Sequence, residues 1–332
     1  MNTTGRISAT DAVSDALEWA RVVCFRPFAL AKWLVLGFCA FLASLGQGGG
    51  GCSPQVRMPW RPWSGAPPQL PNAQIQQGLD WAGAHAALLV GLVLVGFALM
   101  VVLSALLLWL SSRGKFMLLD GVVHDRGQVV EPWKRLRPFG NSLFVFEFCV
   151  AMVAMVLMLT VLLAGGLIAL SDIRARQFGG GAVLALIVVV VCAIPLSIGF
   201  ALLRSALNDF VVPIMYRRGL RAPDAVRVFA VELLRGRVGP FIVFYLLKIA
   251  VAIGAGIAVG VATCLMCCIP VIPYVGSVIF LPVAVFFRSY SLYFLGQFGE
   301  EWRLLPNPHL PPGAVTLQAA PSPDGGGPPA PP

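Results

Sequence analysis

Six long apolar stretches set the architecture of this chain of 332 residues. A helix needs about 20 apolar residues to cross a bilayer. Only 12% of the residues are charged, well below the roughly 25% of a soluble domain. The stretches are continuously apolar, whereas strands of a membrane barrel have about ten residues of alternating polarity. We therefore predict an all-α transmembrane bundle with six spans: 28–46, 86–110, 142–170, 182–203, 241–268 and 271–298.

The Lys and Arg residues divide unequally between the two sides of these spans. Seventeen of the 24 lie before the first span, in the connections after the second and fourth, and in the tail; four lie on the other side and three within spans. Short connections rich in Lys and Arg stay in the cytoplasm. We therefore expect a multi-pass protein of the inner (cytoplasmic) membrane with both termini in the cytoplasm. The net charge of +9 then reflects topology and anionic headgroups on the cytoplasmic face, not nucleic acid.

Amphipathic segments precede three of the spans. The first, residues 7–24, is expected to start at a Ser8 or Thr10 cap and to lie in the cytoplasmic interface. Its predicted apolar face consists of Val13, Leu17, Ala20 and Cys24. ATDAV at 9–13 recurs as APDAV at 222–226, and a weaker version lies at 129–138. The layout indicates three repeats, each an interfacial helix followed by two spans.

Composition also divides the chain into three parts. Residues 1–27 form the first interfacial helix, residues 28–298 form the membrane domain, and residues 299–332 form a cytoplasmic tail. Because the tail is rich in Pro and Gly and cannot bury a core, we expect it to be disordered.

Four segments carry a family resemblance: PFALAKWLVLGFCAFLASLGQGGG (27–50), RGKFMLLDGVVHDRG (113–127), NDFVVPIMYRRG (208–219) and RSYSLYFLGQFG (288–299). Together they resemble an uncharacterised family of bacterial and archaeal multi-pass membrane proteins, a domain of unknown function. The layout is also distantly similar to the membrane domain of some glycerophosphoryl diester phosphodiesterases. Those enzymes keep catalysis in a separate soluble barrel, and the roughly 200 residues of such a barrel are missing from the connections here. The resemblance therefore implies an architecture and carries over no catalytic residue.

Charges in or beside the spans are the candidates for a polar site, because such charges are costly and often functional. They are Glu147, Lys248 and Arg288 within spans, with Arg204 and Asp209 at the end of the fourth. At 1.5 Å per residue, the first three lie within roughly 8–15 Å of the cytoplasmic boundary, so they can form one cluster. We favour a structural role, in which Lys248 and Lys32 reach the interface and Glu147 pairs with Arg288. The alternative is a site that binds an anionic headgroup or relays a proton.

Other motifs are weighed in the same way. The residues expected to contact lipid headgroups are Lys134, Arg135, Arg137, Arg217, Arg218 and Arg221. Cys264, Cys267 and Cys268 are expected to be packed apolar cysteines, with a redox-sensitive pair as the alternative. Gly256 and Gly260 permit close helix approach, which we expect within the bundle.

The sequence contains no recognised catalytic motif. GxSxG, HExxH and Walker-type patterns are missing, and His124-Asp125 is expected to be a solvated turn. We predict no metal, no cofactor and no enzymatic activity. The leading hypothesis is a membrane-organising or scaffold protein, with membrane lipids and a protein as partners. The alternatives are a transporter or lipid-handling permease, and an accessory subunit of a membrane complex.

Overall fold

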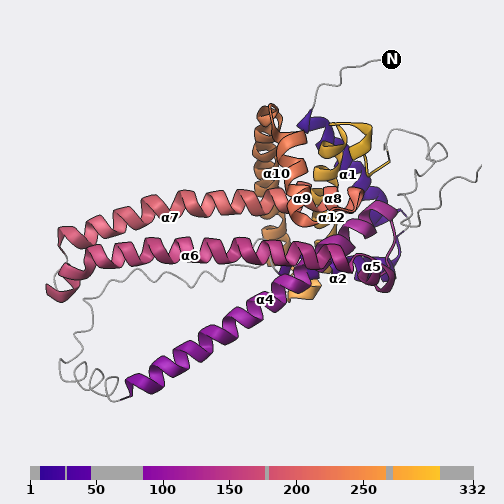
Figure 1. Cartoon of the computed structure of the whole chain (residues 1–332). Helices are drawn as coiled ribbons and strands as arrows, with labels where there is room; N and C mark the ends of the chain where they lie inside the picture. The colour runs from indigo at the N-terminus through magenta and orange to yellow at the C-terminus, as the bar shows by residue number, and fades with distance from the viewer. Residues whose placement is uncertain (1–7, 27, 46–84, 176–178, 267–271, 307–332) are drawn as a thin grey trace, which may run out of the picture.

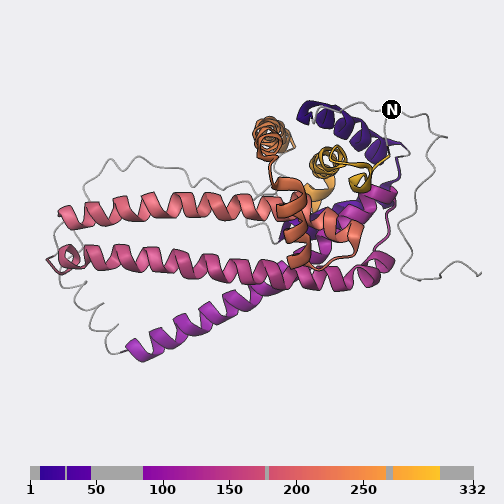
Figure 2. The same ribbon diagram turned by 45° about the horizontal axis from the view of Figure 1, so that its top comes forward.

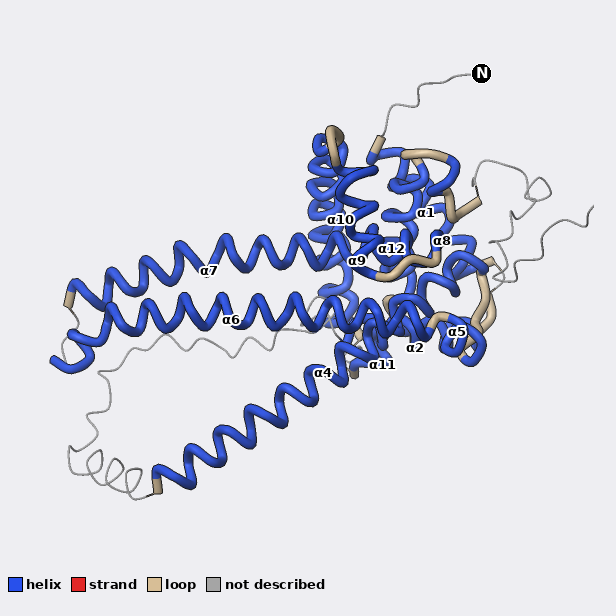
Figure 3. Tube along the Cα trace, in the orientation of Figure 1, coloured by secondary structure: helices blue, strands red, loops and turns tan. Residues whose placement is uncertain are grey.

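The computed structural model describes residues 8–26, 28–45, 85–175, 179–266 and 272–306, and the regular elements of these ranges are all helical. The first half contains α1 (Ala9–Phe25), α2 (Leu30–Leu45), α4 (Ala86–His124), α5 (Val130–Arg135), α6 (Arg137–Ala175) and α7 (Gly180–Ala206). The second half contains η1 (Leu207–Val211), α8 (Val212–Arg218), α9 (Ala222–Val228), η2 (Phe229–Leu234), α10 (Val238–Leu265), α11 (Pro273–Ile279), α12 (Leu281–Gly296) and η4 (Glu300–Trp302). Figures 1 and 3 show α4, α6 and α7 projecting as rods from a head formed by the shorter helices, with α10 at its side.

The rods are longer than a bilayer requires. Helices α4 and α6 have 39 residues each, or about 58 Å at 1.5 Å per residue, against a hydrocarbon core of about 30 Å. Their outer parts expose apolar residues such as Leu99 and Leu163, whereas Phe116 and Leu119, near the other end of α4, are buried. Each rod therefore has an apolar part suited to lipid and a part that belongs to the head.

Within the described part of the chain, four helical segments are long and apolar enough to cross a membrane: Val90–His124, Arg137–Leu170, Gly180–Arg218 and Val238–Leu265. The chain is therefore a membrane-embedded helical protein. The predicted first span corresponds to α2, which has only 16 residues, and the predicted sixth span is divided between α11 and α12 at Phe280. The count of six spans is thus not confirmed.

Helix α10 runs in a different direction from the rods. Figure 1 shows it upright at the head end of α7, and Figure 2 shows it nearly end-on beside the head. It follows η2 through Gly236, whose φ of +78° favours glycine. Helix α10 therefore does not run alongside α4, α6 and α7.

An aromatic core holds the head together. Phe244 of α10 packs on Phe294 of α12, with ring centroids 4.5 Å apart, and stacks on Tyr290 at 4.6 Å. Phe210 of η1 contacts Phe244 at 5.2 Å. Three elements that are distant in sequence thus share one buried cluster.

Helix α1 packs along α12 rather than standing apart from the head. Ser8 caps it as predicted, since its Oγ accepts from the N–H of Asp11 at 3.3 Å. The predicted apolar face is wrong in part: Leu17 is exposed. The buried face consists of Ala9, Ala12, Ala16, Ala20, Val23 and Cys24. Small alanines allow close approach to α12, which a stripe with Leu17 would prevent.

The two ends of the described chain meet at this helix pair. The N–H of Ser8 donates to Oε1 of Gln297 at 2.7 Å, and Nε2 of Gln297 donates back to the Ser8 carbonyl at 2.9 Å. The predicted tail starts at residue 299, yet Trp302 and Leu305 are buried; residues 307–332 lie outside the described part of the chain.

Candidate functional site

A π-helical turn separates α7 from α8. The N–H of Val212 donates to the Leu207 carbonyl, five residues earlier, so the next donor in this register would come from residue 213. That residue is Pro213, which has no N–H. The Asn208 carbonyl therefore lacks the donor that the register would supply. Nη1 of Arg288, on α12, donates to this oxygen at 2.6 Å. Such π turns are frequent at functional sites.

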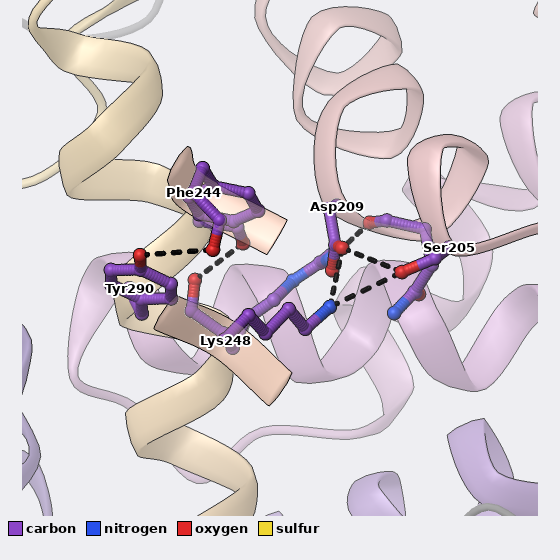
Figure 4. Close-up of polar contacts among 8 residues, drawn as sticks. Ser205, Asp209, Phe244, Lys248 and Tyr290 are labelled. Atoms are coloured by element: carbon purple, nitrogen blue, oxygen red, sulfur yellow. Dashed lines mark hydrogen bonds and ion pairs between the residues drawn. The ribbon is translucent and has the colours of Figure 1, made fainter. Parts of the chain in front are cut away.

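The turn places Asp209 against α10. Lys248 donates to Oδ2 of Asp209 and lies 3.3 Å from Ser205 Oγ, which itself donates to Oδ2 at 3.0 Å (Figure 4). The Asp209 side chain is buried, and that of Lys248 is 20% exposed. We call Ser205, Asp209, Lys248 and Arg288 the polar node. The hydroxyl of Tyr290 beside it donates to the Phe244 carbonyl at 3.3 Å and holds α12 against α10.

Arg288 is the buried cation of the node. The whole residue is 6% exposed, and Asp209 is close enough to attract its charge. Its Nε and Nη2 have no hydrogen-bond partner among the described residues. The guanidinium is thus fixed at one nitrogen and leaves two buried donors facing the interior.

Glu147 lies in a second buried pair. Nζ of Lys115, on α4, is 2.6 Å from Oε1 of Glu147, on α6, and the side chains are 2% and 3% exposed. The expected pairing of Glu147 with Arg288 is therefore wrong. Arg204 and Arg288 are both near enough to Lys115 to repel its charge, so this pair and the polar node share one electrostatic environment. Of the predicted residues, Asp209 contacts Lys248 directly, whereas Glu147 contacts Lys115; Lys115 and Ser205 are contact residues that the sequence did not single out.

Lys248 and Lys32 do not simply reach the interface, as we expected. Lys248 is held by Asp209, and Lys32 of α2 pairs with Asp125 at 2.5 Å. Asp125 follows α4 with a φ of +53°, the left-handed conformation that Asp tolerates at a helix end. Both lysines therefore join helices.

The residues predicted to contact headgroups fall into two groups. Arg135 donates to Asp120, Arg217 to the Glu301 carbonyl, and Arg218 to both carboxylate oxygens of Glu232. Lys134, Arg137 and Arg221 have exposed side chains. Half of the predicted set thus makes contacts within the head.

A further buried carboxylate was not predicted. Oδ1 of Asp120 accepts from Tyr216 at 2.6 Å and from Arg135 at 2.5 Å, and it lies 3.4 Å from Nδ1 of His124. This cluster joins α4, α5 and α8. The spacing of Asp120 and His124, four residues apart on one helix, was the available signal. The turn expected at His124-Asp125 is therefore partly buried.

Arg113, on α4, is a second buried arginine. Its guanidinium lies 4.2 Å from the ring of Trp109 and 4.8 Å from that of Trp133, and it donates to Asn141 at 3.0 Å. Cation–π contacts of this kind fix the angle between α4, α5 and α6. The sequence placed Arg113 in a loop because the apolar stretch ends before it.

The cysteine and glycine motifs behave differently from our expectations. Cys264 is exposed and is not in a disulfide, while Cys267 and Cys268 lie outside the described residues. A Cβ on Gly256 or Gly260 would meet no atom within 4 Å, so the close approach expected within the bundle is wrong. Among the described residues, no group of His, Cys, Asp and Glu is arranged to hold a metal ion.

Comparisons with known proteins give one result. Residues 7–281 match the profile of the family of unknown function DUF7544. No curated protein and no solved structure matches the chain. The match covers most of the sequence and includes the rods, η1 and α10, so the chain belongs to the family of unknown function DUF7544.

Proposed function

We propose that this chain is a non-enzymatic, multi-pass protein of the inner membrane that organises lipids or partner proteins around a rigid head. The observation that carries the proposal is that ion pairs join neighbouring helices of the head. Lys115–Glu147 joins α4 to α6, Lys248–Asp209 joins α10 to η1, and Arg218 joins α8 to η2 and η4. Charges arranged in this way hold helices in position, as a scaffold requires.

The distribution of basic residues supports a cytoplasmic head. The basic connections of the sequence fold into α5, α8 and α9, which lie at the head end of the rods (Figure 1). Since basic connections stay in the cytoplasm, the head and both termini are proposed to lie there. Lys134, Arg137 and Arg221, whose side chains are exposed, are then the candidates for contact with anionic headgroups.

The predicted repeats are also kept as part of the proposal. Helices α1, α5 and α9 each precede a pair of apolar helices in the chain: α2 and α4, α6 and α7, and α10 and α12. This order is compatible with three units and six membrane helices, in which α2 and α12 span the bilayer together with neighbouring residues.

A lipid-handling permease is the second candidate. The π turn at Asp209 interrupts an apolar helix and places a carboxylate against Lys248, and interrupted helices are common at transport sites. Asp209→Asn and Lys248→Met, made together, remove the charges without leaving either one unpaired. A scaffold should keep its partners in this double variant, whereas a permease that uses the pair should lose flux.

The experiment that tests the proposal is gentle extraction from native membranes followed by mass spectrometry of the molecules that co-purify. A stoichiometric protein that stays bound to the double variant would support a scaffold or an accessory subunit. Purification without any protein or ordered lipid, together with flux that depends on Asp209 and Lys248, would contradict it.

A further inference from the structure

Arg288 is held rigidly at one edge. Its Nη1 donates to the Asn208 carbonyl at 2.6 Å, the oxygen that Pro213 leaves without a donor in the π register. The surrounding residues of α12 are buried, including Ser289 and Tyr290. The position of the guanidinium is therefore set by the backbone of η1 and by the aromatic core.

The two nitrogens without a partner form one edge of the guanidinium. Nε and Nη2 of Arg288 are buried and unpaired among the described residues. Their N–H groups point the same way, and this parallel pair of donors matches the two oxygens of a carboxylate or phosphate. A buried charged donor that makes no hydrogen bond costs free energy. An acceptor bound at this edge would remove that cost.

The nearby carboxylates are engaged elsewhere. Oδ2 of Asp209 accepts from Lys248 and Ser205. Oε1 of Glu147 accepts from Lys115, while its buried Oε2 has no hydrogen-bond partner among the described residues. Each of these carboxylates thus has its own lysine, and Asp209 attracts Arg288 without accepting a hydrogen bond from it. Lys115 adds a further positive charge within Coulombic range. The region around the free edge is therefore suited to an anion.

The geometry points to an internal oxyanion site, in which Nε and Nη2 of Arg288 bind the two oxygens of a phosphate or carboxylate group. Lys248, whose side chain is 20% exposed, marks the side of the polar node nearest the surface. The oxyanion comes either from an acidic lipid headgroup or from a small soluble anion. This inference goes beyond the proposed function and does not depend on it.

The test uses the full chain, delipidated in a neutral detergent. Thermal unfolding is measured with inorganic phosphate, with neutral phosphatidylcholine vesicles and with vesicles that also contain phosphatidylglycerol. Native mass spectrometry records any anion that remains bound. Stabilisation by inorganic phosphate identifies a soluble anion, and stabilisation by phosphatidylglycerol vesicles alone identifies a headgroup.

Two variants test whether binding depends on the fork, the Nε and Nη2 edge of the Arg288 guanidinium. Arg288→Lys keeps the charge but loses the parallel donors, so affinity for the effective probe should fall about tenfold or more. Arg227→Lys makes the same change at an exposed arginine of α9 and should bind like the parent chain. Equal binding by Arg288→Lys would overturn the proposal.

If Arg288→Lys fails to fold, the proposal can still be tested on the parent chain by NMR. The nitrogen-15 NMR signal of the Arg288 Nε–H should shift on addition of the effective probe and should be absent from the spectrum of Arg288→Lys. No thermal shift with any probe, no retained anion and no change in that signal would mean that water or Glu147 satisfies the fork, and would refute an oxyanion site.

Discussion

Replacing Lys115 or Glu147 alone should destabilise the head, whereas replacing both should restore most of the loss. The charged atoms are 2.6 Å apart, and the side chains are 2% and 3% exposed. Removing one partner of such a pair leaves an uncompensated buried charge, at a cost of about 3–5 kcal/mol. Apolar residues of similar volume in place of both are often neutral or stabilising.

The surroundings predict which single change is worse. Arg204 and Arg288 repel Lys115, and Glu147 offsets that repulsion. Glu147→Leu leaves the three cations together, so it should reduce the free energy of unfolding more than Lys115→Met does. Both losses should lie near about 3–5 kcal/mol.

The assay is denaturant unfolding in mixed micelles for the parent chain, Lys115→Met, Glu147→Leu and the double variant. The double-mutant cycle should give a coupling energy of at least about 3 kcal/mol. Lys134→Met, at an exposed lysine of α5, should change stability by no more than about 0.5 kcal/mol. Additive losses, or single losses below about 1 kcal/mol as for exposed pairs, would refute the reasoning.

Four further substitutions test the packing of the helices. Gly114→Ala should cost about 1–3 kcal/mol of unfolding free energy, because its Cβ would lie 2.5 Å from the Ala43 nitrogen; Gly256→Ala, with nothing within 4 Å, should leave stability unchanged or higher. Burial raises the pKa of the Cys24 thiol from 9.0 to about 11. The contribution of this thiol to the free energy of unfolding should therefore be complete below pH 9 and decrease towards pH 11, and Cys24→Ala should abolish that decrease. Alkylation of Cys24 at pH 9 should require unfolding. Arg113→Lys should lose the planar stack on Trp109 and Trp133, cost about 1–2 kcal/mol and shift tryptophan fluorescence; unchanged emission and stability would contradict the stacking argument.

Much of the fold follows from hydropathy and local pattern. Continuous apolar runs predicted helices, and Ser8 was one of two predicted caps for α1. The sequence placed Asp209 at the cytoplasmic end of the fourth span and Lys248 near the same boundary, so their association was among the contacts it allowed. These features depend on short-range pattern and on length, which a single sequence contains.

Other features depend on where helices end and which neighbours they meet. The predicted second span stops at residue 110, but α4 continues to His124, and this extension brings Lys115 to Glu147. Hydropathy marks the end of lipid contact, not the end of the helix. Similarly, which face of α1 is buried depends on how α1 fits against α12. The empty space beside Gly256 depends on the direction of α10. Neither follows from local periodicity.

The measurement that tests the central claim most directly is the depth of nitroxide labels in reconstituted bilayers. Single cysteines at Leu99, Leu163 and Ile253, in a chain without its native cysteines, should be accessible to oxygen and protected from an aqueous nickel complex. Labels at Lys134 and Arg227 should behave in the opposite way, with the head in water. Aqueous exposure of the labels at Leu99 and Leu163 would contradict a membrane-embedded protein with rods in lipid.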